Sequence, residues 1–280
     1  MQFTKMQGAG NDFIVINNLE LKIPLEELPQ MASRLCKRGL SIGGNALMVV
    51  DEPTTGGDFK MRFYNADGSI AEMCGNGARC IARYAYEHKI AGESMTIETV
   101  AGDVLAWRQS KRLYKIKLNR PEEVRLDYPV EVDGKEYECS YIELGNPGIP
   151  HAVVRLNGFK ELPEKELFDL GKKLRYHSAF PKGANVNFYE IVGKDLILEK
   201  TFERGVEDFT LACGTGSGSV VTALTLKGLV SGKNVKLTVP GGELFVDAIV
   251  EKGFIEDLYL IGDTNIVAVG EITDEDFIVS

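Results

Sequence analysis

Short runs of alternating apolar and polar residues follow one another in the first half of the chain. They cover 96–99, 104–107 and 113–118, and Lys115 and Lys117 occupy the polar face of the last run. Alternation with a period of two is typical of half-buried β-strands, and glycine turns between such runs favour antiparallel pairing. We therefore expect a meandering antiparallel sheet in the first half.

The second half shows the same alternation. Strands are predicted over 235–239, 244–250, 258–261 and 266–269, and a pair of glycines separates the first two. Period-two runs joined by tight turns again indicate neighbouring antiparallel strands. Both halves of the chain are therefore predicted to be rich in sheet.

Four other segments have helical spacing. Apolar residues recur every three or four positions over 25–35 and again over 167–174, after Pro163, as in amphipathic helices on the outside of a domain. Segments 81–89 and 220–229 carry few charges around their circumference, which is typical of a helix surrounded by sheet. The pattern thus predicts an α+β fold with two pseudo-symmetric lobes, each a mostly antiparallel sheet wrapped around a central helix.

Two similar motifs precede the two central helices. The first, MCGNGARCIARYAYEHK, begins at Met73, and the second, ACGTGSGSVVTALTLK, begins at Ala212. Cys213 lies 139 residues after Cys74, which is about half of the 280 residues. This spacing indicates an internal duplication of one functional unit.

The boundary between the lobes is predicted near Pro121, where charged residues interrupt the strand pattern over 119–123. We expect an N-terminal lobe at 1–118 that carries the first motif, and a C-terminal lobe at 119–263 that carries the second. Residues 264–280 are expected to return to the N-terminal lobe.

Composition and charge argue against some classes of protein, such as nucleic-acid-binding proteins. The chain is 44% hydrophobic and 26% charged, as folded proteins usually are. A formal net charge of −9 argues against a nucleic-acid surface, because phosphate binding needs clustered Lys and Arg. No apolar run approaches the ~18 residues of a membrane span, and the N-terminal segment lacks a signal-peptide pattern. We expect a cytoplasmic protein that binds a small amino-acid substrate and does not bind nucleic acid or a membrane. The protein could also form a homodimer.

Five cysteines, an odd number over a long chain, do not make the pattern of a secreted disulfide scaffold. Cys36, Cys80 and Cys139 are expected to pack as small buried hydrophobes. No two cysteines have Cys-x-x-Cys spacing, and the chain has three histidines, so no metal site is predicted.

Cys74 and Cys213 differ from the other cysteines because a Gly-x-Gly turn follows each of them at once. Amides that converge at a helix N-terminus favour a thiolate and can hold a carboxylate. Two such thiols facing one cavity would form a coupled acid–base pair, in which one removes an α-proton and the other returns it from the opposite side. Inversion of a stereocentre by this route needs no cofactor.

Other readings of the same motifs exist. The sequence GTGSGS from Gly214 could hold a nucleotide phosphate, but the acidic residue of a dinucleotide fingerprint and the Lys-Ser/Thr of a P-loop are missing. A non-catalytic binding protein and a thiol-based redox sensor stay open, and exchange of an α-proton with solvent deuterium separates both from an isomerase.

Four segments carry a family resemblance. They read FTKMQGAGNDFIVI from Phe3, MRFYNADGSIAEMCGNGARC from Met61, GANVNF from Gly183, and TFERG from Thr201 followed by LACGTGSG. In these segments, and nearly end to end, the chain resembles the diaminopimelate epimerase family, whose members are cofactor-independent two-cysteine enzymes of lysine biosynthesis. The resemblance implies two lobes with the active site between them.

The resemblance also implies roles for individual residues. Cys74 and Cys213 become the catalytic acid/base pair, and His151 and Glu203 become candidates for tuning the pKa of a catalytic thiol. Backbone amides would bind the reacting carboxylate, and polar side chains would read the rest of the substrate. The amides are those of Gly75, Asn76, Gly214 and Thr215, and the side chains are those of Asn11, Asn65, Asn146, Asn185, Glu203 and Arg204.

Three segments depart from the family pattern. They are SIGGNA at Ser41–Ala46, the inserted Gly148–Pro150 in NPGIPH, and Val206–Thr210, which is one residue longer than usual. All three lie near expected substrate contacts, so they bear on the substrate more than on the acid/base pair. We predict an epimerase that interconverts LL- and meso-diaminopimelate; the alternative is a racemase of another amino acid, such as histidine, on the same scaffold.

Overall fold

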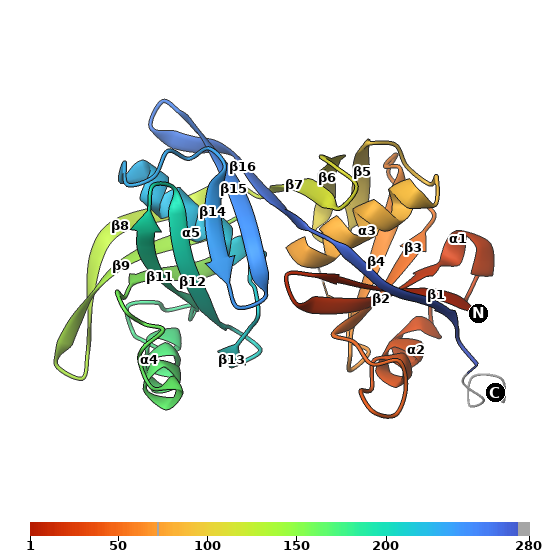
Figure 1. The fold of residues 1–280 in the computed structure, drawn as a ribbon, viewed down its shortest axis with the longest axis horizontal. Coiled ribbons are helices and arrows are strands. Elements are labelled where there is room, and N and C mark those ends of the chain that lie inside the picture. The colour runs from red at the N-terminus through yellow and green to blue at the C-terminus, as the bar shows by residue number, and fades with distance from the viewer. Residues whose placement is uncertain (72, 274–280) are drawn as a thin grey trace. The chain divides into compact units, whose positions relative to one another are not determined.

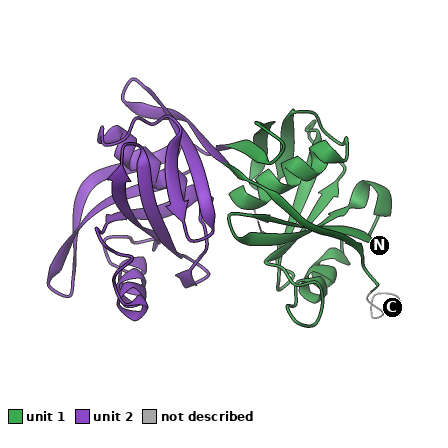
Figure 2. Ribbon diagram, viewed as in Figure 1, with its two compact units in different colours: residues 1–116, 262–280 green, residues 117–261 purple. Residues whose placement is uncertain are grey.

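The computed structural model describes residues 1–71 and 73–273, and the chain divides into two compact units (Figure 2). Unit 1 comprises Met1–Ile116 and the residues from Gly262 onward, and unit 2 is Lys117–Ile261. The chain leaves unit 1 within strand β7 (Leu113–Leu118) and returns within β16 (Phe254–Asp263). Each unit combines many strands with few helices, so the predicted α+β class is confirmed.

Unit 1 is a mixed sheet with helices on both faces (Figure 1). Its elements are β1 (Gln2–Gly8), β2 (Asn11–Asn17), α1 (Asn18–Leu21), α2 (Leu28–Leu35), β3 (Ala46–Asp51), β4 (Phe59–Asn65), α3 (Gly75–Glu87), β5 (Ser94–Thr99), β6 (Gly102–Arg108) and β17 (Asn265–Glu271). Antiparallel pairs join β1 to β2, β3 to β4 and β5 to β6, whereas β2–β3 and β4–β5 are parallel.

The sequence analysis did not predict the strands β1 to β4. Strands β2 and β3 lack apolar–polar alternation, whereas β4 does alternate, with Phe59, Met61 and Phe63 on one face, and was overlooked. Every residue of β3 is buried, and β2 is buried over its four central residues. Helix α3 packs on β1, β2 and β3, and α2 packs on β3 and β4. A strand covered on both faces reads as a continuous apolar run, which periodicity alone does not distinguish from a buried helix.

The last described strand of the chain belongs to unit 1. Strand β17 pairs antiparallel with β1, from Gln2 opposite Glu271 to Gln7 opposite Asn265, with one irregularity between Lys5 and Met6. The backbone amide of Ile272 also donates to the carbonyl of Met1, at 2.7 Å. The first strand of the unit is thus held by the last one.

Unit 2 is also a mixed sheet, built around helix α5 (Figure 1). Its elements are β8 (Pro121–Val132), β9 (Lys135–Leu144), β10 (Ile149–Arg155), α4 (Glu164–Arg175), β11 (Asn185–Gly193), β12 (Leu196–Glu203), β13 (Asp208–Phe209), α5 (Gly214–Leu226), β14 (Val235–Val239) and β15 (Gly242–Glu251). Antiparallel pairs join β8–β9, β9–β10, β11–β12, β12–β13 and β14–β15, and parallel pairs join β10–β11 and β12–β14.

Helix α5 packs against β8, β9, β10, β11 and β15, and α4 covers β11 and β12. The core under α4 contains Phe159, Phe180, Phe188 and Phe202. Both central helices are buried, as the scarcity of charge predicted. Because α5 has sheet around it, its apolar residues need not keep to one side.

Several predicted boundaries differ from the observed ones. Helix α2 begins at Leu28 and not at Leu25, which is 45% exposed, because Pro29 fits the first turn of a helix. The central helices begin earlier than predicted, at Gly75 and Gly214, since their glycine-rich first turns carry no apolar pattern. Pro121 does not interrupt a strand but begins one, a position where the missing amide is tolerated.

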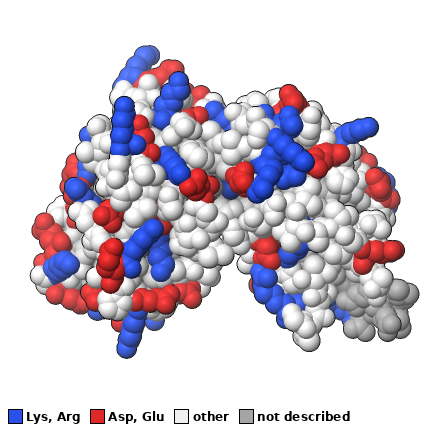
Figure 3. All heavy atoms as spheres, in the orientation of Figure 1, with Lys and Arg blue, Asp and Glu red and all other residues white. Residues whose placement is uncertain are grey.

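The surface carries both signs of charge. On the face drawn in Figure 3, Lys and Arg lie among Asp and Glu on both units. Among the residues that the structure describes, no helix has the length and apolar character needed to cross a membrane.

Candidate active site

Cys74 and Cys213 occupy the same structural position in the two units. Each is the N-cap of a helix of 13 residues, and each has an extended backbone, with φ −136° and ψ 121° at Cys74 and φ −121° and ψ 107° at Cys213. The first amides of a helix have no partner in the helical ladder and carry partial positive charge. Each cysteine therefore lies beside a set of backbone donors suited to an anion.

In unit 1, a hydrogen-bonded network holds the first turn of α3. Asn76 is 2% exposed, donates its side-chain amide to Oδ1 of Asn11, and accepts from Nη2 of Arg79 at 2.7 Å. Asn11 is the first residue of β2. The structure thus brings together three of the residues assigned to unit 1 from the sequence, Asn11, Gly75 and Asn76, beside Cys74.

Asn65 ends β4 and belongs to a tight turn. Its backbone amide donates to the carbonyl of Ser69 at 2.8 Å, and its side-chain amide donates to Oγ of Ser69 at 3.0 Å. The side chain therefore already has a local partner in the turn.

The departing segment Ser41–Ala46 is tied to the start of β2. The backbone amide of Asp12 donates to Oδ1 of Asn45 at 3.0 Å, and that of Asn45 donates to the Asp12 carbonyl at 2.8 Å. The Asp12 carboxylate also binds Lys5, at 2.8 Å, and Arg38. Burial raises the pKa of Asp12, but hydrogen bonds from Arg38 and Lys5 outweigh it, so the pKa is lowered overall.

In unit 2, Cys213 lies in a buried and acidic environment. Its side chain approaches Oγ1 of Thr215 at 3.5 Å, and the residue is 8% exposed. Burial raises the pKa of the Cys213 thiol, and the negative charge of Glu203 raises it further. The hydrogen bond from Thr215 acts in the opposite direction. In this state of the protein the thiol form is strongly favoured.

Asn185 anchors the turn that carries Glu203 and Arg204. It is the first residue of β11, donates to the carbonyl of Pro150 at 3.0 Å, and accepts from the backbone amide of Arg204 at 2.8 Å. Burial raises the pKa of Glu203, the last residue of β12. The Arg204 side chain is exposed, and its Nη1 donates to the carbonyl of Lys182 at 3.2 Å. The carboxyl of Glu203 is thus largely desolvated, whereas the guanidinium of Arg204 is exposed.

His151 lies in β10 and is completely buried. Burial, and to a smaller extent the charge of Arg204, lower its pKa to about 3, although the hydrogen bond with Asn187 acts in the opposite direction. The side-chain amide of Asn187 donates to Nδ1 of His151 at 3.2 Å, so the imidazole is neutral with its proton on Nε2. Within the described residues Nε2 has no hydrogen-bond partner. His151 is therefore arranged to donate a proton or a hydrogen bond, while its role in tuning a thiol stays a prediction.

Asn187 was missed by the sequence analysis. Its amide also donates to the carbonyl of Ala152, at 3.2 Å, and its Oδ1 accepts from Thr201 at 3.0 Å. A Cβ added at Gly216 would meet this Oδ1 at 2.2 Å, so Asn187 fills the space under the first turn of α5. The alternation in GANVNF could have found it, because Asn185 and Asn187 are two positions apart on one face of a strand.

Glu199 was missed as well. This carboxyl is 1% exposed on β12 and accepts from Oγ of Ser217 at 2.6 Å, and Ser217 lies four residues after Cys213 in α5. Burial raises the pKa of Glu199 to about 8, although the hydrogen bonds from Ser217 and Thr201 lower it. A buried acid with no cation to neutralise it is normally protonated at neutral pH.

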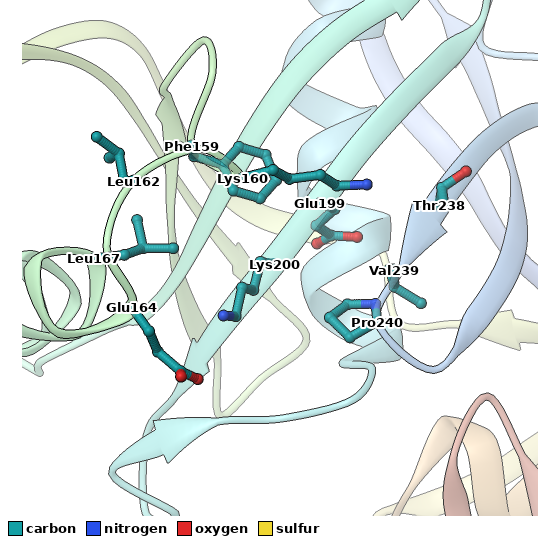
Figure 4. A pocket seen from close by; sticks show the side chains of 10 residues that line it. All are labelled: Phe159, Lys160, Leu162, Glu164, Leu167, Glu199, Lys200, Thr238, Val239 and Pro240. Carbon is teal, nitrogen blue, oxygen red and sulfur yellow. The ribbon is translucent and has the colours of Figure 1, made fainter.

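Glu199 also borders a separate cavity of about 430 Å³ on unit 2 (Figure 4). The cavity lining combines apolar side chains with a few charged ones, and it includes no residue that the sequence assigned to the site. The lining residues are Phe159, Lys160, Leu162, Glu164, Leu167, Glu199, Lys200, Thr238, Val239 and Pro240.

The two remaining departures form ordered turns. Asn146 is exposed between β9 and β10, and Gly148 packs closely on Glu143, whose carboxylate binds Lys182 at 2.8 and 2.9 Å. In the longer segment Val206–Thr210, the Glu207 side chain binds Arg175 at 2.9 Å and the backbone amide of Gly205 at 3.0 Å. Both loops are therefore held by carboxylates.

The other cysteines match their prediction. Cys36, Cys80 and Cys139 are 3%, 0% and 1% exposed, and burial raises the pKa of each. Over residues 1–71 and 73–273, no three His, Cys, Asp or Glu side chains are grouped so that they could hold a metal ion.

Solved structures with similar folds include proteins described as racemases, epimerases and phenazine biosynthesis proteins. A probable proline racemase from Agrobacterium radiobacter has a TM-score of 0.69 and 17% identity, covering 99% of this chain and 94% of that one. A hydroxyproline epimerase from Agrobacterium vitis has a TM-score of 0.67 and 16% identity, covering 97% and 90%. At these identities the likeness concerns the fold alone.

Sequence comparison is more specific. Diaminopimelate epimerase of Aquifex aeolicus is 37% identical over 98% of this chain and 99% of its own length, and that of Archaeoglobus fulgidus is 37% identical over 88% of both chains. The family model described as diaminopimelate epimerase matches residues 3–119 and 144–267. These matches span both cysteine motifs, and the chain belongs to the diaminopimelate epimerase family.

Proposed function

We propose that this protein is a cofactor-independent amino-acid epimerase that interconverts LL- and meso-diaminopimelate with Cys74 and Cys213. The observation that carries the proposal is the repeated geometry of the two motifs, in which each cysteine begins a buried helix with the same extended backbone. Family membership supports an isomerase that acts on an amino acid. The assignment of both thiols and of the substrate is ours.

The proposed reaction exchanges one proton. A thiolate on one side of the α-carbon takes the α-proton, and a thiol on the other side gives its own proton to the carbanion, so that configuration inverts and one thiolate remains. The carbanion places negative charge beside the substrate carboxylate, and first-turn amides of a helix stabilise such charge. In the proposal these amides belong to Gly75 and Asn76 in unit 1 and to Gly214 and Thr215 in unit 2.

The substrate's other end would be read by complementary charges. Arg204 offers a planar guanidinium to a carboxylate, and Glu203 offers a carboxylate to an ammonium group. Asn185 supports this pair by its hydrogen bond to the Arg204 backbone. Binding of diaminopimelate, which carries an amino and a carboxyl group at each end, fits such a paired site.

The alternative substrate is another amino acid, such as histidine. It is favoured by the three departing segments, two of which are held by carboxylates of this chain, Glu143 and Glu207. These anchors shape the loops beside Asn146 and Arg204, where the side chain of a substrate would be read.

Proton exchange tests the proposal. The reduced protein is incubated in deuterium oxide with LL-diaminopimelate, meso-diaminopimelate, histidine and proline in parallel, and α-deuterium and configuration are followed by mass spectrometry and chiral chromatography. Exchange with inversion only for diaminopimelate is expected. Exchange only for another amino acid selects the alternative, and exchange with none of the four contradicts the proposed function.

A further inference from the structure

Arg79 is a buried cation that pairs with no carboxylate among residues 1–71 and 73–273. It lies in the second turn of α3 and is completely buried, and within the described residues it forms no ion pair. Nη2 donates to Oδ1 of Asn76 at 2.7 Å, Nη1 donates to the carbonyl of Gly75 at 3.4 Å, and Nε has no partner among the described residues. Removing a cation from water without a counter-ion costs several kcal/mol. A nearby anion would offset this cost.

Among the acidic groups of the described residues, Cys80, Cys74 and Asp263 interact electrostatically with Arg79. Cys80 is completely buried, and its pKa is raised to about 12 by that burial, so it stays a thiol. The Asp263 carboxylate is exposed and binds Arg112 at 2.9 Å. The half-buried Cys74 is therefore the group whose ionisation would neutralise Arg79 without a further burial cost.

The hydrogen bonds of Arg79 fix the same region. Its guanidinium holds Oδ1 of Asn76, which leaves the Asn76 amide to donate to Asn11. It also holds the carbonyl of Gly75, so both residues directly after Cys74 are contacted by one buried side chain. A fork with fixed donors orients such a turn more firmly than a flexible ammonium would.

The equivalent position in unit 2 has no side chain. Gly218 follows Cys213 by five residues, as Arg79 follows Cys74, and a Cβ there would meet Cδ1 of Leu118 at 2.8 Å. The charges near Cys213 are instead the carboxyls of Glu203 and Glu199, and each raises the pKa of that thiol when ionised. Cys74 therefore has a buried cation behind it, whereas Cys213 has carboxyls that add negative charge only when they ionise.

We propose that Arg79 is a positioning residue that keeps Cys74 ionised in the resting protein while Cys213 stays protonated. The proposal rests on the proposed function for its purpose, because a two-thiol epimerase needs one thiolate and one thiol at the start of each turnover. The charge of Arg79 also acts through the helix, since it adds to the partial positive charge of the first-turn amides. Substrate of one configuration would therefore meet its base at Cys74.

The test measures each thiol without any substrate. The native protein is alkylated briefly with iodoacetamide between pH 5 and 10, and labelling of Cys74 and Cys213 is counted separately by peptide mass spectrometry. The thiolate is the reactive form, so the pH of half-maximal rate reports ionisation. We expect the midpoint of Cys74 to lie at least about one pH unit below that of Cys213, because an opposite charge nearby lowers an acid's pKa by about 1–3 units.

Substitutions then separate the charge from packing. Arg79→Gln removes the charge and should raise the Cys74 midpoint by about 1–3 units, with a much smaller change at Cys213. Arg83→Gln is the matched control, since Arg83 is also buried on α3 but pairs with Glu87 at 2.8 Å. If Arg79→Gln does not fold, as judged by circular dichroism, Arg79→Lys is used, which should leave the Cys74 midpoint within about half a unit of wild type because it keeps the charge.

Two results would overturn the proposal: a wild-type midpoint at Cys74 equal to or above that at Cys213, or a Cys74 midpoint that moves equally in the Arg79 and Arg83 variants. For Arg79→Lys, a rise of a full unit or more would do the same. These outcomes are independent of catalysis. A protein that shows the expected midpoints but exchanges no amino-acid proton would refute the proposed function and leave the role of Arg79 standing.

Discussion

The helix starts at Cys74 and Cys213 share their backbone but not their electrostatics. In unit 1 the buried guanidinium of Arg79 interacts with Cys74, and in unit 2 the carboxyls of Glu203 and Glu199 interact with Cys213. Duplication has preserved the part of the geometry that backbone amides provide, while the side chains behind it have diverged. A symmetric fold can therefore support an asymmetric pair of acids.

The spaces behind the two first turns also differ. The Cβ of a residue at Gly77 would meet Sδ of Met48 and a ring carbon of Phe63, both at 3.0 Å, whereas at Gly216 it would meet the Asn187 amide oxygen at 2.2 Å. The first wall is apolar and includes a flexible thioether, and the second is a hydrogen-bonded amide. The first turn of α3 therefore packs against apolar side chains, whereas the first turn of α5 packs against a hydrogen-bonded amide.

The largest effect is expected when each of the two thiols is removed in turn. Cys74→Ala and Cys213→Ala should each lower kcat/KM for epimerisation by about 10²–10⁴-fold, because each deletes one of two proton-transfer groups. Cys36→Ala and Cys139→Ala are matched controls, since both thiols are buried in a core. Chiral chromatography of product formed in both directions measures the rates. A wild-type rate in either of the first two variants would contradict the paired roles.

The second prediction concerns Glu199, the buried acid of unit 2 that binds Ser217 in the helix that follows Cys213. A carboxyl pKa raised from 4.5 to about 8 contributes stability that is fully present below pH 4.5 and is lost as the pH rises through about 8. Glu199→Gln cannot ionise, so between pH 5 and pH 9 its free energy of unfolding should improve relative to wild type by up to about 5 kcal/mol.

Urea denaturation at pH 5, 7 and 9 measures this difference. Glu136→Gln, at an exposed position of unit 2, is the control and should change little with pH. A difference between Glu199→Gln and wild type that stays constant over this range would show that Glu199 is ionised throughout.

The third prediction compares the two glycines behind the cysteines. Gly216→Ala should destabilise the protein by about 1–3 kcal/mol, because the new methyl displaces Asn187 from Thr201 and His151. Gly77→Ala should be close to neutral, since Met48 can move and alanine gains up to about 1 kcal/mol of helix propensity. Gly193→Ala, whose Cβ would lie 3.6 Å from Leu196, is the control. Urea denaturation measures the free energy of unfolding of each variant. Equal losses for Gly77→Ala and Gly216→Ala would contradict the difference in packing between the two first turns.

The smallest effect is expected when the hydroxyl of Thr215, beside Cys213, is removed. Thr215→Val keeps the shape of the side chain and removes the contact of Oγ1 with Sγ, at 3.5 Å. Because that contact lowers the pKa of the Cys213 thiol, the variant should be alkylated about 2–10-fold more slowly at pH 8, which corresponds to one hydrogen bond. Cys74, measured in the same samples, should react at the wild-type rate. Faster labelling of Cys213 would contradict this role for Thr215.

Local patterns predicted part of the fold, and two of the failures have clear physical reasons. The strands β5, β6, β7 and β14 to β17 were predicted from apolar–polar alternation, and in β5, β6, β7 and β14 the more buried positions do recur every second residue. Strand β3 was missed because all six residues are buried, and α2 was placed too early because Leu25 continues the apolar spacing although it is exposed. Burial on both faces is a tertiary property that a window of sequence does not contain.

The same limit applies to the site. The Gly-x-Gly turns pointed to Cys74 and Cys213, because glycine marks a tight turn or a close backbone approach directly in the local sequence. Arg79 and Glu199 were missed because an arginine in a helix or a glutamate in a strand reads as an exposed residue, as most such residues are. Their importance comes from complete burial, and that depends on strands far away in the chain.

The pairing of β17 with β1 has a consequence for synthesis. A nascent chain that has just emerged with its first 100 residues holds α3 and most of the surrounding strands, but β1 lacks one neighbour until residues 265–271 appear. Contacts of such high sequence separation slow folding and leave a sheet edge open in the meantime. Unit 2, which is continuous from Lys117 to Ile261, can complete its own strand pairing first, so β1 gains its second neighbour only after the whole of unit 2 has been translated.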